Sequence, residues 1–176
     1  MDAHVHMELN PEDREPPKQT DLGQRPLMRE RAAAMVSAGI TTARDLGGGA
    51  WLELELRDRI NAGEVPGPRL LCAGQPITSP GGHCHFWGGE AADMDAANTV
   101  LTRQVAHGVD LIKVMATGGR MTRGSTPLEP QFDLPTLAGI VAAAHDHQLP
   151  VAAHCHGTAG IELAAQAGVT TIEHCS

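Results

Sequence analysis

The sequence predicts an α/β protein made of consecutive strand–helix units, arranged as an incomplete (β/α)8 barrel of the TIM type with about six units. At three places a helical pattern ends in a glycine and β-branched or apolar residues follow at once, at Gly39, Gly108 and Gly168. Glycine tolerates the positive φ of a helix C-terminus, and the residues after it suit a buried strand. The chain has 176 residues, fewer than the roughly 250 of a complete barrel.

The expected helices follow from apolar residues that recur every three or four positions. They cover residues 26–38 and 50–61, begin after the N-caps Asp93 and Asp133, and end with 158–167. The strands expected between them are 1–6, 40–45, 69–74, 110–116, 150–155 and 170–174. An open doubly wound sheet fits the same order of elements. A dinucleotide-binding sheet of that kind needs a glycine-rich turn after its first strand, and the residues that follow His6 provide none.

The first strand begins at Met1, and Ser176 follows the sixth strand directly. Because natural domains rarely start and stop inside their own sheet, we expect a fragment or a truncated chain. Such a chain exposes apolar strand edges, so we also expect poor solubility or self-association into a homo-oligomer.

Composition excludes several classes of partner. The formal net charge of −8 argues against nucleic acid, and no apolar run approaches the roughly 18 residues that span a membrane. The N-terminus lacks a signal-peptide pattern. The four cysteines show no disulfide-scaffold spacing, which indicates free thiols in a reducing, cytoplasmic compartment.

His-X-His occurs four times, and local geometry separates the four pairs. His4 and His6 close a predicted strand, where side chains two apart share a face, so both can reach one metal ion. The pair at 145 and 147 ends a helix, where the two side chains point about 200° apart and cannot chelate together. The pair at 83 and 85 lies in a glycine-rich loop, so its geometry stays open. His156 would share the face of His154 only if that strand continued, and it is not included in the predicted site.

Three further strands carry a polar residue at or near the carboxyl end: Lys113, His154 and His174. In a barrel these ends converge on one face, where active sites lie. Each residue alone could be a buried structural group, but four strands sharing the feature favour a metal site of imidazole ligands. A lysine in an apolar strand has a depressed pKa. Its neutral amine can react with carbon dioxide to give a carbamate that bridges two metals.

Several segments resemble the amidohydrolase superfamily. Residues 2–6 (Asp-Ala-His-Val-His) are similar to its first-strand motif, and 112–119 to its fourth-strand lysine and glycine turn. Residues 153–157 and 172–175 look like its fifth- and sixth-strand ligand segments. Residues 41–48 and 80–83 resemble the branch that contains imidazolonepropionase-like enzymes, prolidases and arginine carboxypeptidases.

The resemblance implies a single partial barrel domain over 1–176, without the N-terminal β-sandwich part and without strands seven and eight. It implies a binuclear centre of two divalent ions, expected to be zinc, with His4 and His6 on one, His154 and His174 on the other, and a carboxylated Lys113 between them. Lys113 and His174 are the expected catalytic residues. His83 and Arg120 are candidates for binding the small-molecule or dipeptide-like substrate that the resemblance implies, because both follow strands whose loops face the site.

The expected function is therefore metal-dependent hydrolysis of carbon–nitrogen bonds in amides or peptides by a metal-activated hydroxide. The family's eighth-strand aspartate, which orients that hydroxide, has no counterpart among these six strands. Two alternatives stay open: a catalytically inactive metal-binding fragment of such an enzyme, and an α/β binding protein without a metal. Activity assays would separate the first from the enzyme, and elemental analysis would identify the second.

Overall fold

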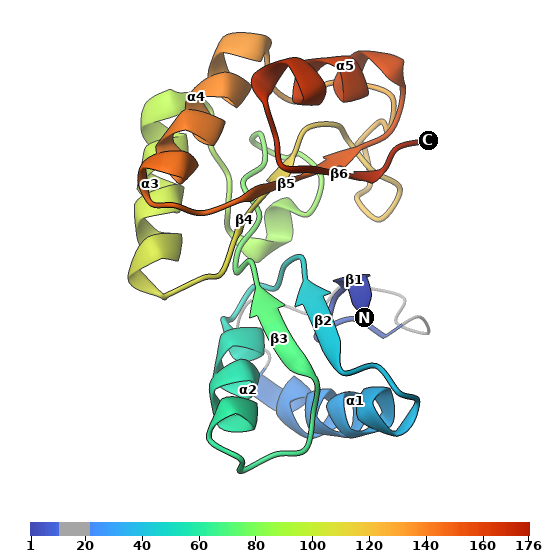
Figure 1. The fold of residues 1–176 in the computed structure, drawn as a ribbon. Helices are drawn as coiled ribbons and strands as arrows, with labels where there is room; N and C mark the ends of the chain where they lie inside the picture. The colour runs from blue at the N-terminus through green and yellow to red at the C-terminus, as the bar shows by residue number, and fades with distance from the viewer. Residues whose placement is uncertain (11–21) are drawn as a thin grey trace.

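The computed structural model describes residues 1–10 and 22–176, and in these ranges it has six strands and five α-helices in alternation (Figure 1). The strands are β1 (Asp2–Val5), β2 (Thr42–Asp45), β3 (Arg69–Cys72), β4 (Ile112–Met115), β5 (Val151–Cys155) and β6 (Thr171–His174). The α-helices are α1 (Arg25–Ser37), α2 (Leu52–Asn61), α3 (Met94–Ala106), α4 (Leu134–Asp146) and α5 (Thr158–Ala167). Two short 3₁₀ helices, η1 (Leu22–Gln24) and η2 (His85–Trp87), precede α1 and follow β3.

The strands form two parallel sheets in chain order, β1-β2-β3 and β4-β5-β6 (Figure 1). This order confirms the predicted incomplete barrel. The interruption between β3 and β4 was not predicted. It arises where β3 ends at Cys72 and the chain passes through Gly74, at positive φ, and Pro76, which has no backbone N–H. Ile77 then takes the place beside β4, donating to the Lys113 carbonyl at 2.8 Å and accepting from Met115 N at 2.8 Å.

The signals at the helix ends act as the sequence predicts. Gly39, Gly108 and Gly168 all adopt positive φ, at 83°, 71° and 81°. Asp93 and Asp133 cap α3 and α4, each accepting a backbone N–H three residues later at 2.9 Å. Each strand is shorter than expected by one or two residues at one or both ends. None of the described helices is long and apolar enough to cross a membrane.

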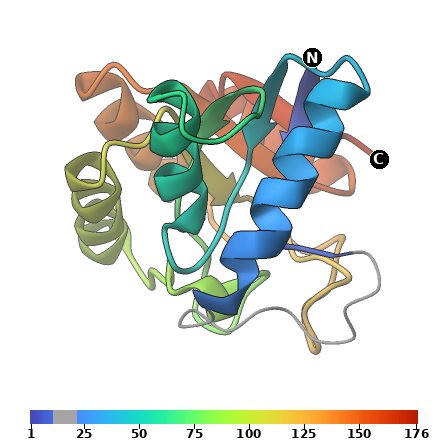
Figure 2. The ribbon, with the colours of Figure 1, turned by 90° about the horizontal axis from the view of Figure 1, so that it is seen from below.

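The helices cover the outer faces of both sheets. Figures 1 and 2 show α1 and α2 side by side against the first sheet, and α3, α4 and α5 against the second. One hydrophobic core joins the two halves, since Met28 of α1 and Leu70 of β3 belong to the same buried cluster as Ile140 of α4 and Val151 of β5. The continuous core gives the strand ends a fixed relative position.

The glycine after α3 offers a direct test of the helix-to-strand rhythm. A Cβ on Gly108 would meet no atom within 4 Å, so substitution changes backbone strain and little else. We expect Gly108→Ala to lower the free energy of unfolding by about 1 kcal/mol, and Gly108→Asn by clearly less, because asparagine tolerates the left-handed region. Urea denaturation of the two variants measures the difference. Equal losses would show that positive φ is not what selects glycine here.

Candidate metal centre

A cavity of about 250 Å³ opens where the carboxyl ends of β1, β5 and β6 come together. Every residue that the sequence analysis assigned to the site lines it. The lining consists of His4, His6, His83, Cys84, Trp87, Lys113, Met115, Arg120, Met121, His154, His156 and His174. Six imidazoles and one lysine therefore face a single small volume. The pair at the end of α4, His145 and His147, lies outside this cavity, as the sequence geometry indicated.

His6 is oriented by the loop after β2. Its Nδ1 lies 2.9 Å from the carbonyl oxygen of Gly47, which can only accept, so Nδ1 carries the proton and Nε2 keeps its lone pair. Asp45 fixes both partners, because its carboxylate accepts from Met7 N at 2.7 Å and Gly47 N at 2.9 Å. Burial raises the pKa of Asp45 to about 7, against the opposing effect of these two backbone donors.

His154 is oriented in the same manner by the loop after β4. Its Nε2 lies 2.9 Å from the carbonyl oxygen of Gly118, so Nε2 holds the proton and Nδ1 remains free. The next residue, Gly119, lies under the ring of His83, where a Cβ would fall 2.4 Å from ring atoms. Glycine is required there for His83 to pack against the loop. His83 Nδ1 also lies 3.1 Å from the hydroxyl of Thr122.

The imidazoles form a continuous series across the cavity. Ring centroids are 5.3 Å apart for His6 and His4, 4.7 Å for His4 and His174, and 4.7 Å for His174 and His154. His83 adds a further ring 4.6 Å from that of His154. The sequence therefore predicted a set of histidines that the fold brings together, although their roles as ligands remain predictions.

Two residues at this site lay outside the sequence prediction. His156 stacks on His174 with centroids 4.9 Å apart, and its ligand atom lies within 4.8 Å of those of His154 and His174. The His-X-His spacing at a strand end was the available signal, but β5 stops at Cys155, so alternation could not place His156. Glu173 accepts from His4 Nδ1 at 2.9 Å, and nothing in its own segment distinguishes it from a surface residue.

Burial keeps four of these imidazoles uncharged. Desolvation, reinforced by the nearby Lys113 charge, lowers the pKa of His6 to about 3 and that of His83 to about 4. Desolvation, with His83 and Lys113 adding to it, lowers the pKa of His154 to about 2. Desolvation and the neighbouring His4 lower that of His174 to about 4. Neutral imidazole is the metal-binding form, so these four histidines are in ligand form at neutral pH.

Lys113 is buried in β4, with 1% of its surface exposed. Burial lowers the pKa of its ammonium to about 8, which leaves a fraction of neutral amine near neutral pH. Among residues 1–10 and 22–176, no carboxylate lies within 4.0 Å of its amino group. Arg120, by contrast, is exposed at the rim of the same cavity, where its guanidinium is accessible to a bound molecule.

The chain belongs to the amidohydrolase family, whose sequence model matches residues 1–176. It is 31% identical over 163 residues to an ochratoxinase of Aspergillus niger, a match that covers 78% of this chain and 33% of that protein. A solved Xaa-Pro dipeptidase with bound methionine superposes with a TM-score of 0.88 at 31% identity, over 98% of this chain and 47% of that one. A putative prolidase from Bifidobacterium longum gives 0.77 at 29% identity, over 98% and 39%. The chain thus spans about a third of the ochratoxinase and under half of these solved chains.

The residues present suit a divalent transition metal. The ligand atoms of His154, His156 and His174 all lie within 4.8 Å of one another, and imidazole nitrogens are preferred zinc ligands. His6 and His154 each keep one nitrogen free because a backbone oxygen engages the other. Such outer partners are typical of histidines that bind metals.

The low histidine pKa values predict acid sensitivity of the metal-free protein. Below pH 6.5 an unfolded histidine takes up a proton that buried His154 refuses until about pH 2, so the unfolded state binds more protons and stability falls on acidification. We expect a loss of about 1.4 kcal/mol per pH unit from such a group between pH 6.5 and 5. Denaturant unfolding at several pH values measures the slope.

The non-titrating variant His154→Gln should reduce this slope by the contribution of one histidine, whereas His145→Gln at the exposed end of α4 should leave it as in the wild type. A slope that is unchanged in His154→Gln would mean that His154 is not held neutral by the fold.

Proposed function

We propose that this chain carries the metal-binding part of a hydrolase that cleaves amide bonds, with a binuclear zinc centre as its cofactor. The observation that carries the proposal is the convergence of six imidazoles and a buried lysine on one cavity at the strand ends. A divalent ion there would supply a Lewis acid for the amide carbonyl and lower the pKa of water. Membership of the amidohydrolase family and the likeness to a Xaa-Pro dipeptidase and an ochratoxinase support an amide as substrate.

The ligands divide by strand. His4 and His6 of β1 would hold one ion, and His154 and His174 of the second sheet the other. Lys113 lies on β4 between these groups in chain order, and its lowered pKa supports reaction of the neutral amine with carbon dioxide, with loss of a proton, to a carbamate whose oxygens would be available as ligands to both ions. His156 is a further candidate ligand, because its nitrogen lies in the same group as those of His154 and His174.

The chain's own residues also provide substrate contacts. His83 is buried and neutral, so it can donate a hydrogen bond to a carbonyl or accept one without carrying a charge. Arg120 at the rim can pair with the carboxylate of a dipeptide. Trp87 and Met115 form an apolar wall that limits water in the cavity.

Hydrolysis of a panel of Xaa-Pro dipeptides and N-acyl amino acids by zinc-loaded protein tests the function. We expect activity with zinc that a chelator abolishes and zinc restores, and that His154→Ala lowers by at least a hundredfold. Zinc binding without hydrolysis of any amide would favour the alternative of an inactive metal-binding fragment. That alternative stays open because the chain covers only part of each relative. Protein that binds no metal would overturn the proposal.

Variants of Lys113 distinguish a centre of two metal ions from a centre of one. Lys113→Ala would remove the bridging anion and leave all the histidines. Two dications would then repel each other strongly, because the dielectric constant in such a cavity is low. We expect folded Lys113→Ala to keep at most one zinc per chain, and a short carboxylic acid in the buffer to restore part of the second.

Lys113→Met is the matched control, because it also lacks the amine but fills the space that the acid would need. It should lose the second zinc without rescue. Two zinc ions retained in folded Lys113→Ala would exclude the bridging role.

A further inference from the structure

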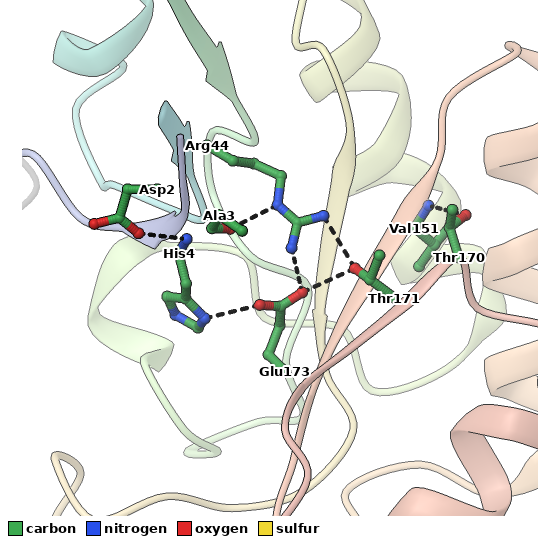
Figure 3. Close-up of polar contacts among 8 residues, drawn as sticks. All are labelled: Asp2, Ala3, His4, Arg44, Val151, Thr170, Thr171 and Glu173. Atoms are coloured by element: carbon green, nitrogen blue, oxygen red, sulfur yellow. Dashed lines mark hydrogen bonds and ion pairs between the residues drawn. The ribbon is translucent and has the colours of Figure 1, made fainter. Parts of the chain in front are cut away.

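Glu173 of β6 extends across the barrel interior to β1 and β2 (Figure 3). One carboxylate oxygen, Oε2, lies 2.9 Å from Nδ1 of His4. The other, Oε1, accepts from Arg44 Nη2 at 2.5 Å and from the Thr171 hydroxyl at 2.8 Å. The two oxygens therefore have separate tasks: one is anchored to β2 and β6, and the other faces the histidine.

The anchor is itself held on both sides. Arg44 donates through Nε to the carbonyl of Ala3 at 2.8 Å and through Nη1 to Thr171 at 3.1 Å (Figure 3). The guanidinium thus joins the backbone of β1 to the side chains of β6. Only 7% of the Glu173 side chain is exposed, so this carboxylate has little freedom to turn away.

The charge state of Glu173 decides the direction of the His4 hydrogen bond. The Arg44 guanidinium and the Thr171 hydroxyl both donate to Oε1, and this ion pair favours the ionised carboxylate. An ionised carboxylate only accepts, so His4 must carry its proton on Nδ1. That leaves Nε2 with the lone pair that a metal requires.

We propose that Glu173 is a positioning residue that sets the tautomer and ring orientation of His4 for metal binding, with Arg44 and Thr171 holding it in place. The inference rests on the proposed function and extends it to a residue on another strand. The backbone carbonyls of Gly47 and Gly118 set the tautomers of His6 and His154 in the same way. His4 differs because its partner is a side chain, which can be changed by mutation.

Glu173→Gln tests the assignment because the network dictates how the amide must turn. Arg44 only donates, so the amide oxygen faces Arg44 and the amide NH₂ faces His4. His4 Nδ1 must then accept, and the proton moves to Nε2, the nitrogen that the metal needs. Nitrogen NMR of protein labelled in its histidine rings reports the tautomer without any metal, and the His4→Gln spectrum assigns the signals.

We expect Nδ1–H for His4 in the wild type and Nε2–H in Glu173→Gln, with zinc affinity, measured by chelator competition, lowered about 10- to 100-fold. Glu162→Gln is the matched control, since it makes the same change at an exposed position of α5 and spares the Oε2 contact of Glu173 with His4. It should keep the wild-type tautomer and an affinity within about threefold.

An unchanged His4 tautomer in Glu173→Gln, or an equal loss of affinity in Glu162→Gln, would overturn the role of Glu173 while leaving zinc binding by the wild type intact. A wild-type protein that binds no zinc would instead overturn the proposed function, and the tautomer of the metal-free protein would still decide what Glu173 does to His4.

Discussion

The site depends on oxygen acceptors that hold buried imidazoles in one orientation. A neutral imidazole has one donor and one acceptor nitrogen, and an oxygen acceptor beside one of them selects that nitrogen to carry the proton. Each partner here comes from a different strand end: Gly47 after β2 serves His6, Gly118 after β4 serves His154, and Glu173 of β6 serves His4. The register of the strands therefore determines which oxygen faces each histidine nitrogen. A shift of one residue would place a different group there.

The fold was predictable because its signals are local. Helix periodicity, the aspartate caps and the glycines at positive φ each act within a few residues, and the strands follow by exclusion. The separation into two sheets was not predictable. It depends on the loop after β3 returning to lie against β4, where Ile77 bonds to both neighbours of Val114. Apolar Ile77 has the same local signature whether it lies in a strand, a bridge or a loop.

The candidate residues were predictable to the extent that they occupy regular strand positions. Lys113, His154 and His174 were found because parallel strands end on one side, whereas His156 lies one residue past the end of β5 and its direction follows from the turn into α5. Glu173 was missed for another reason. Its partner His4 is 169 positions away, and no spacing rule connects residues on opposite sides of a barrel.

The division of the candidate ligands between the two sheets has a thermodynamic consequence. His4 and His6 belong to the first sheet, and Lys113, His154 and His174 to the second, with no strand-to-strand ladder from β3 to β4. Any ion bound by both groups would favour only those conformations in which the halves are correctly docked, and its binding energy would count toward holding them together. A bound ion would then make the two sheets unfold more cooperatively. Partial opening between the sheets should be rarer in the metal-loaded protein than its core packing alone would allow.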